Sequence, residues 1–181
     1  MHKLNLLGIT VSAVVLALSM PANGDLLITA VYDGPLSGGT PKGVELYVEN
    51  DIADLSAYAL GSANNGGGSD GQEFTFPAEA ATAGSFIYVA SSADPFAAYF
   101  GFTPNYTSSS MSINGDDAVE LFKDGIVIDL YGDINVDGNG DPWEYLDGWA
   151  YRVDGIGANG GVFSDLDFTL RRECSRWLFG K

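Results

Sequence analysis

The sequence has few of the residues on which most enzyme chemistry depends. Its 181 residues include one histidine, His2, and one cysteine, Cys174. A Ser-His-Asp triad, a histidine general base and a histidine-containing zinc site all need an imidazole, and a disulfide needs two cysteines. The sequence therefore excludes a disulfide within the chain and argues against the common hydrolase and nuclease chemistries, so no catalytic residue is assigned.

Basic residues are also scarce. The chain has 8 Lys and Arg against 24 Asp and Glu, a net charge of -16. Nucleic acids are normally bound by clusters of Lys and Arg that displace counterions from the phosphates, so direct nucleic-acid binding is not expected. Because 46% of the residues are hydrophobic, the composition indicates one folded acidic domain and not a disordered chain.

Residues 1–24 have the pattern of a signal peptide. His2 and Lys3 form a basic start, residues 4–20 are apolar, and Ala22 and Gly24 provide a small-x-small cleavage site before Asp25. The alternative is an uncleaved membrane anchor, but this run is at the short end for a bilayer span and no second one follows. The sequence predicts cleavage, a domain without a membrane span, and export to the extracellular space or periplasm.

Short segments of alternating polarity, bounded by turn residues, predict β-strands. In residues 43–50, Glu45 and Glu49 alternate with apolar side chains, so we expect these two acids to face water. The predicted strands are residues 26–32, 43–50, 58–62, 72–76, 85–90, 118–123, 126–131 and 148–153.

Two local signals define the connections. Asp124-Gly125 suits a tight turn and predicts an antiparallel hairpin. Residues 94–100 are the one helical segment, with Asp94 as a cap and three aromatic residues on one face. Strands at this spacing with a single short connecting helix predict an all-β, immunoglobulin-like antiparallel β-sandwich.

Residues 133–144 match the calcium-loop pattern D-x-[DN]-x-[DN]-G-x5-E. Calcium takes six to eight oxygen ligands, and Gly138 would permit the sharp turn of such a loop. An ordinary acidic turn between strands is the alternative, since no flanking helix is expected and Asp, Asn and Gly are common in turns. The candidate calcium ligands are Asp133, Asn135, Asp137, Asn139, Asp141 and Glu144.

Two further groups have both a structural and a functional interpretation. Asp116, Asp117 and Glu120 resemble a paired-carboxylate site, but a turn followed by a solvated Glu120 explains them more simply. Four aromatic residues follow the acidic loop and suit core packing better than a sugar-stacking platform. They are Trp143, Tyr145, Trp149 and Tyr151.

Residues 171–181 differ in composition from the domain that precedes them. Residues 25–170 have 3 basic and 23 acidic residues, a charge of -20, whereas the last eleven residues include Arg171, Arg172, Arg176 and Lys181. This atypical segment is either a basic tail that lies on an acidic body or the result of a truncation or frameshift.

Several segments resemble the bacterial lamin-tail domain, an immunoglobulin-like sandwich found at the N-terminus of large secreted nucleases of the endonuclease/exonuclease/phosphatase superfamily. They are LLITA at 26–30, GVELYVEN at 43–50, DLSAYAL at 54–60, GSFIYVA at 84–90, NGDDAVELFKDGIVID at 114–129, GDINVDG at 132–138 and PWEYLDGWAYR at 142–152. No segment resembles the catalytic domain of those nucleases. At residues 168–172 the sequence departs from the family pattern, which puts the family's last strand in doubt.

The resemblance implies a secreted, non-catalytic module at residues 25–170 that acts by binding or positioning, related to a truncated extracellular nuclease. One alternative is a calcium-dependent surface adhesin or carbohydrate-binding module that uses the acidic loop. Another is a fragment of a nuclease that has kept only this domain. The expected partner is a protein or a glycan.

Overall fold

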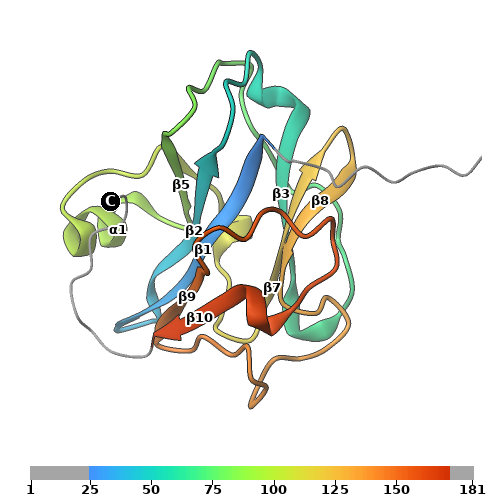
Figure 1. Ribbon diagram of the computed structural model, residues 1–181. Helices are drawn as coiled ribbons and strands as arrows, with labels where there is room; N and C mark the ends of the chain where they lie inside the picture. The colour runs from blue at the N-terminus through green and yellow to red at the C-terminus, as the bar shows by residue number, and fades with distance from the viewer. Residues whose placement is uncertain (1–24, 172–181) are drawn as a thin grey trace, which may run out of the picture.

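A computed structural model describes residues 25–171, which form two β-sheets with a shared hydrophobic core (Figure 1). The predicted leader, residues 1–24, and residues 172–181 of the basic segment lie outside the described residues. The predicted all-β sandwich with one short helix is confirmed.

One sheet has six strands in the order β10-β9-β1-β2-β5-β6, and the other has four in the order β4-β3-β7-β8. All neighbouring strands are antiparallel except β5 and β6, which are parallel. The strands are β1 (Leu26–Leu36), β2 (Thr40–Val48), β3 (Tyr58–Ala63), β4 (Phe74–Thr75), β5 (Phe86–Ala90), β6 (Tyr106–Thr107), β7 (Ala118–Lys123), β8 (Ile126–Tyr131), β9 (Gly148–Arg152) and β10 (Phe168–Arg171). The short 3-10 helices are η1 (Leu55–Ala57), η2 (Asn64–Gly66), η3 (Ser109–Met111) and η4 (Asp165–Asp167).

Strand β10 is the main departure from the expected strands. It pairs with β9 over four residues, from Phe168 opposite Arg152 to Arg171 opposite Trp149. The Phe168 ring is buried, with its centroid 4.8 Å from that of Tyr131, so core packing holds this strand in place. The doubt raised by the family pattern about a strand here was therefore unfounded, and Arg171 ends this strand.

The helix α1 (Ala93–Phe100) is confirmed, although it begins after Ser92, so Asp94 lies in its first turn instead of capping it. Phe96 and Phe100 pack on Tyr32 of β1, at ring-centroid distances of 6.1 and 5.7 Å. The helix therefore covers part of the outer face of the six-stranded sheet (Figure 1).

The main core lies between the two sheets and includes residues from both. On β1 the register shifts between Ile28 and Ala30. Because of this bulge at Thr29, Ile28 and Val31 both belong to the inner core, while Tyr32 belongs to a second cluster with α1. The bulge thus gives β1 one apolar face toward the sandwich and another toward the helix.

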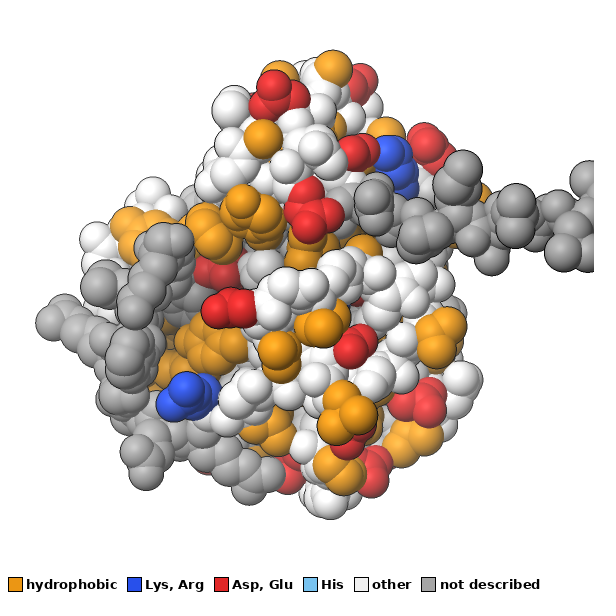
Figure 2. All heavy atoms as spheres, viewed as in Figure 1, with side chains coloured by type: hydrophobic (Ala, Val, Ile, Leu, Met, Phe, Trp, Pro, Cys, Tyr) orange, Lys and Arg blue, Asp and Glu red, His pale blue; other side chains and the backbone are white. Residues whose placement is uncertain are grey.

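Figure 2 shows carboxylate side chains scattered over one face of the molecule and basic side chains at only a few places. Within residues 25–171, no helix has both the length and the apolar character needed to cross a membrane.

Candidate functional site

The acidic loop predicted to bind calcium connects β8 to β9. The Asp133 Oδ1 accepts a hydrogen bond from the Asn135 N–H at 2.9 Å, and the Asp137 Oδ1 accepts one from the Asn139 N–H at 3.1 Å. These four residues are exposed, whereas Asp141 and Glu144 are half-buried. The loop is a series of turns and bends. Among the described residues, no three His, Cys, Asp or Glu side chains form a group able to hold a metal ion.

Gly138 is needed in this loop for a reason other than the one predicted. Its φ is not among the positive values of the chain, but a Cβ at this position would lie 2.4 Å from the Trp143 ring. Trp143 is itself buried, and its carbonyl accepts a 2.5 Å hydrogen bond from the Tyr131 hydroxyl. Close packing on Trp143, and not a sharp turn, therefore explains this glycine.

The four aromatic residues after the loop divide between two clusters. Trp143 and Tyr145 belong to the core between the sheets, and Trp149 and Tyr151 belong to the cluster on the outer face. The packing interpretation is thus confirmed for Trp143, Tyr145 and Trp149, which are buried, and Tyr151 packs against the outer cluster.

The carboxylates at the start of β7 hold a neighbouring loop. The Asp117 Oδ1 accepts from the Asn65 N–H at 2.9 Å, and the Glu120 Oε2 accepts from the Ser69 hydroxyl at 2.7 Å. Both side chains are buried, so the expectation that Glu120 is solvated is wrong. Burial raises the pKa of Asp117 and that of Glu120, but their bonding to residues 62–71 gives them a structural role.

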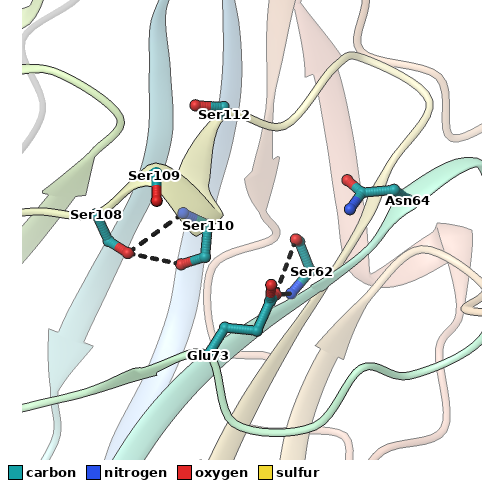
Figure 3. Close-up of a pocket in the computed structure, with 7 residues that line it drawn as sticks. All are labelled: Ser62, Asn64, Glu73, Ser108, Ser109, Ser110 and Ser112. Atoms are coloured by element: carbon teal, nitrogen blue, oxygen red, sulfur yellow. Dashed lines mark hydrogen bonds between the residues drawn. The ribbon is translucent and has the colours of Figure 1, made fainter.

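A polar cavity of about 280 Å³ lies beside β3 and η3 (Figure 3). One oxygen of its carboxylate, Glu73 Oε2, accepts from the Ser62 N–H at 2.7 Å and from the Ser62 hydroxyl at 3.0 Å. The Ser108 and Ser110 hydroxyls lie 2.8 Å apart. The cavity is lined by Ser62, Asn64, Glu73, Ser108, Ser109, Ser110 and Ser112.

Three lining side chains remain available for a ligand. Within the described part of the chain, Asn64, Ser109 and Ser112 make no side-chain hydrogen bond, and Figure 3 shows them around the cavity. A hydroxyl can donate and accept, and an amide offers two donors and an acceptor. The sequence analysis missed this cavity, although the run of three serines at 108–110 was a signal for it.

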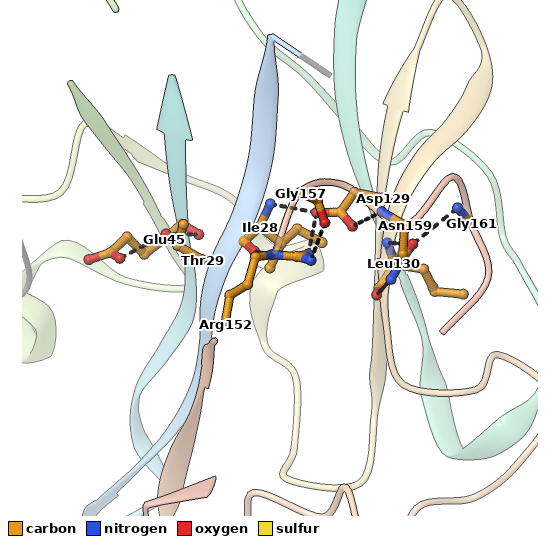
Figure 4. A network of polar contacts seen from close by, with 9 residues as sticks. All are labelled: Ile28, Thr29, Glu45, Asp129, Leu130, Arg152, Gly157, Asn159 and Gly161. Carbon is orange, nitrogen blue, oxygen red and sulfur yellow. Dashed lines mark hydrogen bonds and ion pairs between the residues drawn. The ribbon is translucent and has the colours of Figure 1, made fainter. Parts of the chain in front are cut away.

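The most fully bonded polar group of the interior joins the two sheets (Figure 4). The Asp129 Oδ2 on β8 accepts from the Ile28 N–H at 2.8 Å and from the Arg152 Nη2 at 2.5 Å. The Arg152 Nε donates to the Ile28 carbonyl at 2.6 Å, and its guanidinium lies 4.5 Å from the centre of the Phe168 ring. Burial raises the pKa of Asp129, against the lowering effect of Arg152 and of two backbone N–H groups.

Asn159 completes this network at the edge of the four-stranded sheet. Its backbone N–H donates to the Asp129 Oδ1 at 3.0 Å. Its side-chain Oδ1 accepts from the Leu130 N–H at 3.0 Å, and its Nδ2 donates to the Leu130 carbonyl at 2.7 Å. The side-chain amide therefore bonds β8 as a neighbouring strand would.

Glu45 is a second buried carboxylate, on the opposite side of β1 (Figure 4). It is only 4% exposed, so the expectation that it faces water is wrong. Its Oε1 accepts from the Thr29 hydroxyl at 2.8 Å. Burial raises the pKa of Glu45 to about 7, while hydrogen bonds from Thr29 and Tyr88 lower it.

The chain was compared with models of protein families, with curated proteins and with solved structures, and no match was found in any of the three.

Proposed function

We propose that residues 25–171 form a non-catalytic binding module whose serine-lined cavity takes a small neutral polyhydroxylated ligand, such as one or two saccharide units. The observation that carries this proposal is the chemistry of the cavity, which is lined entirely by hydroxyl, amide and carboxylate side chains. Binding sites commonly lie on loops held by a rigid scaffold.

The state of the lining groups favours a neutral ligand. The Oε2 of Glu73 accepts two hydrogen bonds from Ser62, and the cavity has a carboxylate but no basic side chain, which disfavours an anion. The side chains of Asn64, Ser109 and Ser112 can each exchange hydrogen bonds with hydroxyl groups. A volume of about 280 Å³ is near the lower end of the range for small-molecule sites.

Titration of the ¹⁵N-labelled protein with a panel of neutral mono- and disaccharides tests the proposal by NMR. We expect saturable shifts of the amide signals of residues 108–112 with at least one sugar, weakened several-fold by Asn64→Ala or Ser109→Ala. Ser56→Ala, an exposed serine of η1 that does not line the cavity, is the matched control. The absence of shifts at residues 108–112 with every sugar would contradict the proposal.

We also propose that the module is exported and is of the lamin-tail type, related to a truncated extracellular nuclease. The support is the resemblance of residues 25–153, together with the β-sandwich architecture that such a domain requires. An in-frame or one-base-shifted nuclease sequence downstream of the coding region would support truncation, and unrelated flanking sequence would count against it.

A calcium site at residues 133–144 is the second candidate, favoured by the oxygen-bearing side chain at each liganding position of the motif. In the described conformation Asp133 and Asp137 each accept a hydrogen bond from a backbone N–H of the loop, and a bound calcium ion would compete for these oxygens. Calorimetric titration of the chelator-treated protein should then show saturable heat, lost in Asp133→Asn with Glu144→Gln and retained in Asp165→Asn. No heat would leave the loop as an acidic turn.

A further inference from the structure

Four Asn-Gly pairs lie within the described part of the chain. Asparagine is a chemically labile residue, and a following glycine favours its deamidation because no Cβ hinders the approach of the glycine nitrogen to the asparagine side chain. The pairs share this local chemistry, so the fold is what distinguishes them. They are residues 65–66, 114–115, 139–140 and 159–160.

Deamidation consumes one water molecule and releases one ammonia. The glycine backbone nitrogen loses its proton to solvent and attacks the Cγ of the asparagine amide, which closes a five-membered succinimide and expels the amide nitrogen as ammonia. Water then opens the ring at one of its two carbonyl groups and leaves aspartate or isoaspartate. A reactive pair therefore needs a glycine N–H that no acceptor holds and an asparagine side chain that is free to turn toward it.

The second pair in the chain has its glycine nitrogen held by a buried carboxylate. The Gly115 N–H donates to the Asp33 Oδ2 at 3.0 Å, and Asp33 is buried. The Asn114 Oδ1 accepts from the Lys42 Nζ at 2.7 Å. Both reacting groups are therefore engaged, and the reaction would have to break both hydrogen bonds.

The fourth pair belongs to the bonding of the β8 edge. The Gly160 N–H donates to the Ile128 carbonyl at 2.9 Å. The Asn159 side-chain amide is hydrogen-bonded to Leu130 through both its oxygen and its nitrogen. This side chain cannot turn toward the Gly160 nitrogen without losing the bonds to β8.

The first pair has its backbone held on both sides. The Asn65 N–H donates to the Asp117 Oδ1 at 2.9 Å, and the Gly68 N–H donates to the Ile134 carbonyl at 2.8 Å. Gly66 lies against the backbone of the acidic loop, closely enough that a Cβ would collide with it. The backbone rotation that brings the nitrogen to the side chain is therefore blocked.

The third pair, Asn139 and Gly140, is the one that the fold leaves open. Both residues are exposed, in a turn that the Asp141 N–H closes on the Gly138 carbonyl at 2.9 Å. Within residues 25–171, neither the Gly140 N–H nor the Asn139 side chain makes a hydrogen bond. Apart from the neighbouring residues, no atom lies within 4 Å of the place of a Cβ on Gly140. We propose that Asn139 is the deamidation site of the folded protein.

Deamidation at this position changes the acidic loop in two ways. It adds a carboxylate to a loop that already has Asp133, Asp137 and Asp141. Isoaspartate also moves one methylene group from the side chain into the main chain, which lengthens the turn. A sample kept in solution therefore becomes a mixture of forms that differ in this loop.

Peptide mapping of the full chain after incubation in mildly alkaline buffer measures each pair separately. Chymotryptic peptides are analysed by mass spectrometry, because each conversion replaces an amide nitrogen by an oxygen and raises the mass. We expect Asn139 to convert at least about tenfold faster than the other three asparagines, since their reaction requires local opening of the structure. Comparable rates in the native protein, or faster conversion at any other pair, would overturn the proposal.

The same incubation in urea separates the effect of the fold from that of the sequence. The four pairs should then react at similar rates, because the unfolded chain holds none of their glycine nitrogens. If Asn139 keeps its lead in urea, the fold is not the cause of its reactivity and the proposal fails.

Two matched variants identify the reacting residue within the loop. In the native protein, Asn139→Gln should abolish the conversion of the peptide that covers residues 132–143, because glutamine cannot close the five-membered ring. Asn135→Gln, which changes the other asparagine of this peptide, should leave the rate unchanged. Conversion that persists in Asn139→Gln and is lost in Asn135→Gln would overturn the assignment.

Discussion

A buried carboxylate lies on each side of strand β1, and the two differ in the groups that donate hydrogen bonds to them. On the inner side, Asp129 receives two backbone N–H groups and the Arg152 guanidinium. On the outer side, Glu45 accepts hydrogen bonds from the Thr29 and Tyr88 hydroxyls and forms no ion pair with a described residue. Two carboxylates buried to a similar degree therefore differ in their surroundings, because one has a cationic partner and backbone donors and the other has neutral hydroxyl donors.

The contrast depends on the bulge at Thr29. Where the register of β1 shifts, the Ile28 N–H and carbonyl bond the side chains of Asp129 and Arg152. At the same position the Thr29 hydroxyl bonds Glu45 on the other face. One local irregularity thus provides partners to both carboxylates, but more of them to Asp129.

Removing Asp129 should have the largest effect on stability. Asp129→Ala leaves the Arg152 charge and the Ile28 N–H buried without their acceptor, so we expect the free energy of unfolding to fall by about 3–5 kcal/mol. Urea denaturation followed by tryptophan fluorescence measures it. Asp129→Asn keeps an acceptor for the Ile28 N–H, so its free energy of unfolding should fall less. An equal fall in both variants would argue that the hydrogen bond from the Ile28 N–H does not contribute to stability.

Glu45→Gln should change the pH dependence of stability. Because burial raises the pKa of Glu45 from 4.5 to about 7, its contribution to stability is full below about pH 4.5 and falls until about pH 7. Glutamine removes this fall, so the variant should gain about 2–3 kcal/mol relative to its parent between pH 5 and pH 8. Denaturation at the two pH values measures the gain.

Glu49→Gln is the matched control, because it removes the same charge from an exposed position. An equal pH-dependent gain in Glu49→Gln would contradict the assignment of the effect to the burial of Glu45.

The smallest effect is expected from the partly exposed ion pair of Lys123 with Asp25. The two side chains are 37% and 33% exposed, and the hydrogen bond from Lys123 lowers the pKa of Asp25. Lys123→Ala should reduce the free energy of unfolding at pH 7 by at most about 1 kcal/mol. The loss should shrink when the pH falls below the pKa of Asp25 or when NaCl is raised, and a loss as large as that of Asp129→Ala would contradict the comparison.

The elements that could be predicted from the sequence are those defined by local chemistry. The hairpin of β7 and β8 depends on Asp124 and Gly125, whose φ values of 51° and 79° suit the expected turn. Alternation correctly places Glu45 on the face opposite the main core. It could not show that this face is covered, because the aromatic residues of α1 and the neighbouring strands come from distant parts of the sequence.

The features that the sequence analysis got wrong or missed depend on segments that are far apart in the chain or too short to show a pattern. Glu120 is buried, and its carboxylate accepts from the Ser69 hydroxyl, 51 residues earlier in the chain. β6 has only two residues and leaves no alternation to detect. The serine-lined cavity brings Ser62 and Glu73 together with residues 108–112, and no local pattern connects these segments.

Asn159 has a consequence for the behaviour of the protein in concentrated solution. β8 is the last strand of its sheet, and the bare backbone of an edge strand is a template for adding a strand from another molecule. The Asn159 amide occupies both hydrogen-bonding groups of Leu130. At Leu130, therefore, the strand of another molecule cannot pair with β8 unless it displaces the Asn159 side chain.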